Sequence, residues 1–194
     1  MTEFAEILGK LRTRLSPPER VRIDPRSISQ AAVTVILRES GGTGEFLVIQ
    51  RAEDPRDHWS GHLALPGGRA DEQDASLLAT AVREVREEVG IELSPEDNFV
   101  GQLRSISPSS LRLPSILVTP FVATAPEEFE VRLSFEVSAA FWVSIPHLRL
   151  RGRDTSVTLE IDQTAYRWLA YTSEKGPIWG ITERIITDFL AHLD

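Results

Sequence analysis

Three glutamates fall close together in the stretch Arg83-Glu84-Val85-Arg86-Glu87-Glu88-Val89-Gly90. On a helix, residues three and four positions apart are neighbours, so Glu84, Glu87 and Glu88 would share one face. Like charges at this spacing destabilise an isolated helix by roughly a few tenths of a kcal/mol per pair. Because the helix gains nothing from the cluster, the pattern favours a chemical role for the three carboxylates.

Carboxylate oxygens in such a cluster are the ligands that a hard divalent cation prefers. Mg²⁺ keeps several of its waters and is typically bound by one or two carboxylates together with substrate phosphates. We therefore interpret Glu84, Glu87 and Glu88 as ligands of Mg²⁺, with Mn²⁺ as a substitute. Arg83 lies one turn before Glu87 and is expected to hold that carboxylate in a fixed orientation. The alternative is a solvated acidic helix face without a ligand.

The helix that positions these residues is predicted from Asp74 to Val89, because apolar residues recur there at steps of four, three and four. Asp74 is the expected N-cap and Gly90 the expected C-terminal stop. Directly before the helix, Gly67-Gly68 follows an apolar run at 63–65. Glycine at this place lets the backbone approach a ligand where a side chain would block it.

The remaining pattern predicts one mixed α/β domain over residues 1–194, in which 1–30 form an N-terminal helix and lead-in. Helical spacing recurs over 3–15 and 181–193. A glycine-rich turn at 41–44 is expected to join the first two strands as a hairpin. Helices would cover a central sheet. Its strands are expected at 31–37, 46–49, 99–106, 116–125, 139–145 and 166–171. Trp142, Trp168 and Trp179 are expected to fill the core.

The composition limits the classes of partner. The formal net charge of -8 argues against a nucleic-acid partner, since duplex binding normally needs a basic patch. Cysteine is absent from the sequence, which excludes disulfides, thiolate metal sites and cysteine nucleophiles. No apolar run is long enough to span a bilayer, and the N-terminus lacks a signal-peptide pattern. We expect a cytoplasmic monomer or homodimer with no membrane partner.

The motif around the glutamates resembles the Nudix box, G-x5-E-x7-R-E-U-x-E-E-x-G-U, in which U is aliphatic. The right half matches at every specified position from Arg83 to Ile91. In the left half, the acid that follows Gly68 after five residues is Asp74, and eight residues separate it from Arg83 where the pattern has seven. The resemblance therefore carries over Glu84, Glu87 and Glu88 and leaves the role of Asp74 open.

Segments outside the box extend the resemblance to roughly residues 31–190. Arg51-Ala52, Arg56 and Gly61, with the stretch 178–185, are similar to the coenzyme A diphosphatase branch of the family. Four residues lie between Arg56 and Gly61 where the branch motif has three, and Leu65 replaces its usual Phe. Glu136, six residues before Trp142, is similar to a loop glutamate that serves as the base in some members. A simple edge-strand glutamate is the alternative.

The resemblance implies a Nudix fold, an α/β/α sandwich around a mixed β-sheet. It also implies Mg²⁺-dependent hydrolysis of a pyrophosphate bond in a nucleoside diphosphate linked to another moiety, with coenzyme A or a derivative as a candidate substrate. The alternatives are a nucleotide-metabolite sensor without hydrolysis and a sanitising hydrolase for oxidised nucleoside triphosphates. The expected catalytic residues are Glu87, Glu84, Arg83 and Glu136, the metal ligands Glu84, Glu87, Glu88 and the Gly68 carbonyl, and the substrate-binding residues Arg51, Arg69 and Gly67.

Overall fold

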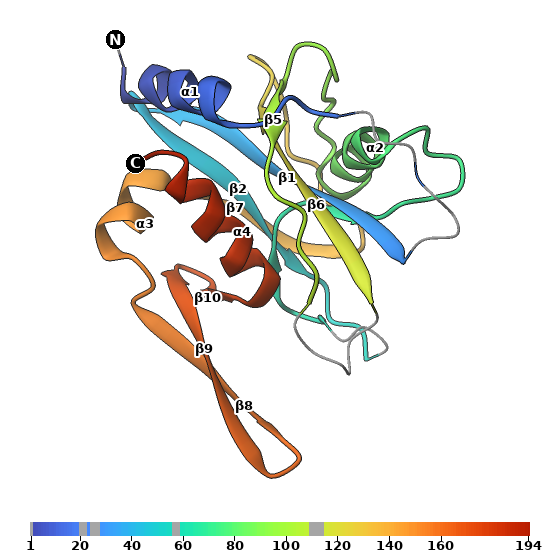
Figure 1. Cartoon of the computed structure of the whole chain (residues 1–194), viewed down its shortest axis with the longest axis vertical. Helices are drawn as coiled ribbons and strands as arrows, with labels where there is room; N and C mark the ends of the chain where they lie inside the picture. The colour runs from blue at the N-terminus through green and yellow to red at the C-terminus, as the bar shows by residue number, and fades with distance from the viewer. Residues whose placement is uncertain (1, 20–22, 24–27, 56–58, 109–114) are drawn as a thin grey trace.

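The computed structural model describes residues 2–19, 23, 28–55, 59–108 and 115–194 (Figure 1). None of the helices in these ranges is long and apolar enough to cross a membrane. The elements follow in the order α1 (Glu3–Arg14), β1 (Ser29–Ser40), β2 (Thr43–Arg51), β3 (Leu63–Ala64), β4 (Gly67–Arg69), α2 (Leu77–Val89), β5 (Phe99–Gln102), β6 (Ile116–Thr124), β7 (Val137–Ser144), α3 (Ile145–Arg151), β8 (Thr155–Ile161), β9 (Thr164–Ser173), β10 (Gly176–Trp179) and α4 (Gly180–Ala191).

The main sheet is mixed, as the sequence predicts. Its strands lie in the order β3-β2-β1-β6-β5, and β4 and β7 pair with β1 and β2. β1 pairs in parallel with β6, with Val35 opposite Val122, whereas its pairs with β2 and β4 are antiparallel. The expected glycine-rich hairpin is present, since β1 and β2 are joined through Gly41 and Gly42, both with positive φ. The long β1 strand therefore connects the hairpin to the glycine turn at β4.

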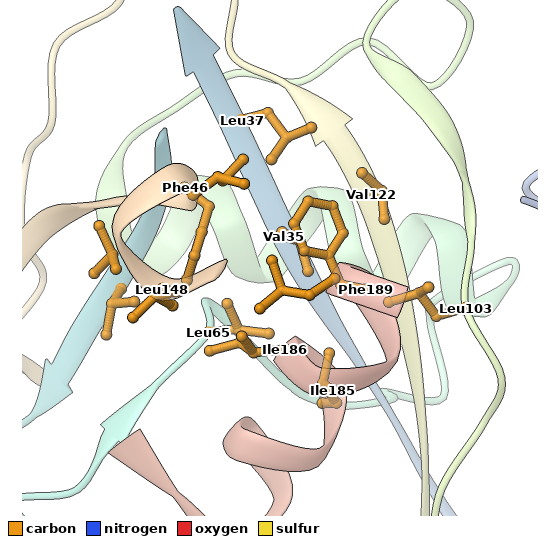
Figure 2. Packing of buried hydrophobic residues seen from close by; sticks show 14 of the residues in the cluster. Val35, Leu37, Phe46, Leu65, Leu103, Val122, Leu148, Ile185, Ile186 and Phe189 are labelled. Atoms are coloured by element: carbon orange, nitrogen blue, oxygen red, sulfur yellow. The ribbon is translucent and has the colours of Figure 1, made fainter. Parts of the chain in front are cut away.

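Helices cover both faces of this sheet because successive side chains of β1 point to opposite sides. Val35 and Leu37 pack toward α1, α3 and α4, and Figure 2 shows them beside Phe46 of β2 and Phe189 of α4. Ile36, between them in sequence, packs instead against α2. The predicted α/β/α sandwich is confirmed, and α2 is the helix that occupies one layer of it.

A second sheet, in the order β10-β9-β8, differs from the sequence-based expectation. Only a strand at 166–171 is predicted there, whereas β8 and β10 are missed. β8 escapes prediction because its residues are largely polar, and it pairs with β9 across Asp162 and Gln163, which both have positive φ. The β8–β9 hairpin extends away from the main sheet in Figure 1.

Trp168 and Trp179 do not fill the core as expected, whereas Trp142 packs against the cluster that contains Ile36. Trp168 and Trp179 are half-buried on the second sheet. Trp142 is also half-buried, on β7, where the guanidinium carbon of Arg38 lies 4.1 Å from the centre of its ring. The largest fully buried side chains are aliphatic or phenylalanine.

The glycine turn before α2 is locked onto β1. Gly67 has a φ of 149°, a conformation that side chains rarely adopt, and a Cβ atom there would lie 2.5 Å from the Cα atom of Val33. The backbone N–H of Thr34 donates to the carbonyl of Pro66 at 2.8 Å. This close approach fixes where the chain leaves the sheet toward the acidic helix.

The ends of α2 agree in part with the prediction. Gly90 is the C-cap in the left-handed conformation, as expected. The N-cap is Ser76 rather than Asp74, and its hydroxyl accepts a hydrogen bond from the N–H of Ala79. The helix therefore begins two residues later than predicted, which leaves Asp74 in the preceding loop.

We predict that Gly67→Ala destabilises the protein by about 3 kcal/mol or more, because the added methyl group meets the backbone of β1. The matched control is Gly9→Ala in α1, where no atom lies within 4 Å of an added Cβ atom. This control should raise stability by roughly 0.5–1 kcal/mol, since alanine favours the helix. Urea unfolding of both variants measures the difference, and similar stabilities would contradict the close packing at β4.

Candidate active site

The guanidinium group of Arg83 is the hub of the acidic cluster on α2. Its Nε and Nη2 atoms donate to the two carboxylate oxygens of Asp74 at 3.0 and 2.9 Å. Its Nη1 atom donates to Glu84 at 2.8 Å and to Glu87 at 3.0 Å. The remaining bond runs from Nη2 to the carbonyl of Arg69 at 3.0 Å. The Arg83 cation thus contacts three carboxylates and the last residue of β4, the strand that contains the glycine turn.

Asp74 joins the cluster in spite of the extra residue in the box. Because α2 begins only at Leu77, the loop before it absorbs the insertion, and the carboxylate pairs with Arg83 in bidentate fashion. Thr80 Oγ1 and the N–H of Asp71 also donate to it, at 2.8 and 2.9 Å. Burial alone would raise the pKa of Asp74, but these hydrogen bonds together lower it. The sequence leaves the role of Asp74 open, and in the structure Asp74 anchors Arg83.

Glu88 is the buried member of the cluster, with 3% of its surface exposed. One carboxylate oxygen, Oε2, accepts a hydrogen bond from the backbone N–H of Gly67 at 2.8 Å. Burial raises the pKa of Glu88 to about 7, against the lowering effect of that hydrogen bond, and the nearby carboxylate of Glu84 raises it further. The N–H of Gly67, a residue expected to contact substrate, is engaged by Glu88, and its substrate-binding role stays a prediction.

Glu84 lies against the second glycine of the turn. A Cβ atom at Gly68 would lie 2.6 Å from the carboxyl carbon and from both carboxylate oxygens of Glu84. Burial raises the pKa of Glu84, whereas the hydrogen bond from Arg83 lowers it. A side chain at position 68 would therefore displace the carboxylate of Glu84 from its place beside the glycine turn.

Arg51 and Glu136 reach the cluster from the sheet. Arg51 ends β2, and the N–H of Ala52 donates to the carbonyl of Glu136 at 2.8 Å. The charge of Arg51 lowers the pKa of Glu88, whereas the charge of Glu136 raises it. The loop that carries Glu136 is fixed to α2 through the N–H of Ser134, which donates to the carbonyl of Glu88 at 3.0 Å. These contacts bring both predicted residues to the edge of the site.

The other two predicted positions are placed less directly. The Arg69 side chain is exposed, and the contact that joins this residue to the cluster is its backbone carbonyl. Arg56, which contributes to the resemblance to the coenzyme A diphosphatase branch, lies outside the described residues. A substrate-binding role for either arginine stays a prediction.

The carboxylate oxygens of the cluster are the type of ligand that a hard divalent cation prefers. In the ranges that the structure describes, no three Asp, Glu or His side chains converge into a preformed metal cage. Arg83 holds one carboxylate oxygen of Glu84 and one of Glu87, and the N–H of Gly67 holds one of Glu88. Five carboxylates surround two arginines, so the site has an excess of negative charge that a cation would offset. The metal role of these residues stays a prediction.

Comparison with known proteins identifies the family. The family model of the NUDIX domain matches residues 28–164, which is well over half of the chain. The chain belongs to the Nudix family. Nudix hydrolase NudL of Shigella flexneri serotype 5b is 32% identical over 176 residues, which cover 90% of this chain and 88% of NudL. The predicted class, a Nudix hydrolase, is therefore confirmed.

Two further similarities extend this assignment. A Schizosaccharomyces pombe protein is 40% identical over 118 residues, which cover 59% of this Nudix chain; the match spans 36% of the yeast protein's length. The crystal structure of a MutT/nudix family protein from Enterococcus faecalis matches with a TM-score of 0.60 at 21% identity and covers 95% of this chain and 66% of that one. The shared architecture confirms the predicted Nudix fold.

We predict that Glu88→Gln stabilises the protein at pH 8 in the presence of a chelator. Since the folded pKa of Glu88 is about 7 and its ordinary value is 4.5, the unfolded chain ionises first as the pH rises. The wild type therefore loses stability between these values, by about 3 kcal/mol in full, and glutamine removes that loss while keeping an acceptor for Gly67.

Thermal unfolding measures this effect. The variant should melt several degrees above the wild type at pH 8, and the difference should shrink toward pH 4.5, where the carboxyl group is protonated in the folded protein and half protonated in the unfolded chain. Equal melting temperatures at pH 8 would show that Glu88 is not held as a strained buried charge.

Proposed function

We propose that the protein is a divalent-metal-dependent diphosphatase that cleaves a pyrophosphate bond in a nucleoside diphosphate linked to another moiety, with coenzyme A or a derivative as the preferred substrate. The observation that carries this proposal is the set of carboxylates gathered around Arg83 on the helix that bears the complete right half of the Nudix box. The segments similar to the coenzyme A diphosphatase branch support the choice of substrate.

Glu84, Glu87, Glu88 and the carbonyl of Gly68 would hold the metal ion. A bound Mg²⁺ or Mn²⁺ offsets the charge of phosphate oxygens and lowers the pKa of a coordinated water. For Glu84 and Glu87, the oxygen that does not face Arg83 is the donor available for this purpose. Arg83 and Gly67 then act by fixing where the carboxylates point, since each holds one oxygen of its partner.

The proton of the attacking water needs a carboxylate that is near the cluster and open to solvent. Glu87 fits best because 52% of its side chain is exposed and Arg83 orients it. Glu84 is the next candidate on the same helix, and Glu136 is a further one, because its charge acts on both Glu84 and Glu88. Proton transfer by a positioned carboxylate typically contributes about 10²–10⁴-fold to the rate.

Arginines at the edge of the cluster are suited to the diphosphate. Guanidinium groups pair with phosphate oxygens in bidentate fashion, and Arg51 and Arg69 are the last residues of β2 and β4. They would also reduce the repulsion between an anionic substrate and an acidic protein with a formal net charge of -8.

We predict that Glu87→Gln lowers kcat by at least about 100-fold on the best substrate, because the base and one ligand oxygen are lost. The wild type should require Mg²⁺ or Mn²⁺, and a panel of coenzyme A, ADP-ribose and an oxidised nucleoside triphosphate, with products identified by mass, should show the highest kcat/KM for coenzyme A.

The matched control is Glu92→Gln, an exposed carboxylate just after α2, which should retain activity. Circular dichroism should show that both variants are folded. Full activity of Glu87→Gln would remove the proposed site, whereas tight binding of the nucleotides without any product over hours would favour the sensor. A higher kcat/KM for the oxidised triphosphate would favour the sanitising hydrolase.

A further inference from the structure

Four aromatic rings form a row that starts at β3 and runs along the second sheet. The ring centre of His62 lies 4.8 Å from that of Trp179, which lies 6.0 Å from that of Trp168. Trp168 in turn lies 5.8 Å from Tyr166. These separations lie within the range in which aromatic rings interact favourably. We refer to these residues, His62, Trp179, Trp168 and Tyr166, as the aromatic row.

The register of the second sheet places the row on one face. Trp179 pairs with Ala170, and residues two apart on a strand share a face, so Trp168 and Tyr166 point to the same side. Tyr166 is 47% exposed, and the two tryptophans are half-buried. Tyr166 and Trp168 lie on the β8–β9 hairpin, which extends from the body, and none of the four rings is fully buried, so the row favours contact with a ligand.

One end of the aromatic row, His62, lies beside Arg51 of the candidate active site. The carbonyl of His62 accepts a hydrogen bond from the N–H of Arg51 at 3.0 Å, and the charge of Arg51 acts on the buried Glu88. His62 also precedes the glycine turn by a few residues, and β10 packs against β3. The aromatic row therefore begins near the end of β2, where Arg51 lies close to the carboxylate cluster. From there the row extends along the second sheet, away from the cluster.

We propose that the Trp168–Trp179 part of the aromatic row stacks against the planar base of the nucleoside diphosphate substrate. The inference rests on the proposed function, because that function places the diphosphate at the cluster beside Arg51. A substrate in which a planar base is joined to a diphosphate needs a binding site with a charged part and an aromatic part. His62 lies between the charged carboxylate cluster with Arg51 and the two tryptophans. Stacking is tolerant of the identity of the base, since every base has an aromatic face.

The test compares AMP with ribose 5-phosphate, which differ by the adenine base. Competitive inhibition or calorimetry with the intact chain should show that the wild type binds AMP more tightly. Trp168→Leu keeps an apolar side chain but removes the ring, and should reduce this preference by about 10-fold, within the range for one lost base stack. Trp168→Phe should restore it.

The matched control is Leu169→Ala, an exposed position on the opposite face of β9, which should keep the preference. Melting temperatures of all variants identify any that fail to fold. An unchanged preference in a folded Trp168→Leu variant, or no preference in the wild type, would overturn the proposal. A wild type that prefers AMP through Trp168 but cleaves no diphosphate would instead reject the proposed function and leave the stacking surface standing.

Discussion

The guanidinium group of Arg83 holds together the acidic cluster on which the proposed chemistry depends. Arg83 donates to Asp74, Glu84 and Glu87 and also holds the carbonyl of Arg69, so it joins the helix to the glycine turn. Without this cation, neighbouring carboxylates on one helix face would repel one another. Arg83 therefore keeps several carboxylate oxygens in place that could serve as metal ligands. The cluster still carries a net negative charge, which favours a bound cation.

The glycine turn imposes the complementary constraint, because carboxylates and backbone compete for the same space. Gly67 fits against β1 only without a side chain and directs its N–H to Glu88. Gly68 leaves room for the carboxylate of Glu84. The burial that results raises the pKa of both glutamates, so the site is less stable than an apolar one would be. Buried charged groups that lower stability are typical of functional sites, where the arrangement of side chains serves catalysis or binding.

The sequence predicts the parts of the structure that depend on local patterns. The apolar face of α2, its end at Gly90, the contact of Arg83 with Glu87 and a mixed α/β domain follow from spacing and apolar periodicity. The α/β/α layers follow from the resemblance to the Nudix family. The pairing of Asp74 with Arg83 does not, because an inserted residue breaks the motif and only the folded loop absorbs it. The strand β8 also escapes prediction, because it is defined by its pairing with β9 rather than by a strong apolar run.

X-ray diffraction at the manganese absorption edge, from crystals grown with Mn²⁺, most directly locates a cation in this site. We expect an anomalous peak at roughly 2.0–2.3 Å from carboxylate oxygens of α2 and from the carbonyl of Gly68, with the bond between Asp74 and Arg83 intact. Strong Mn²⁺ sites elsewhere, together with Glu84 and Glu87 still bound to Arg83 and no peak beside the glycine turn, would contradict the assignment of the cluster as a metal centre.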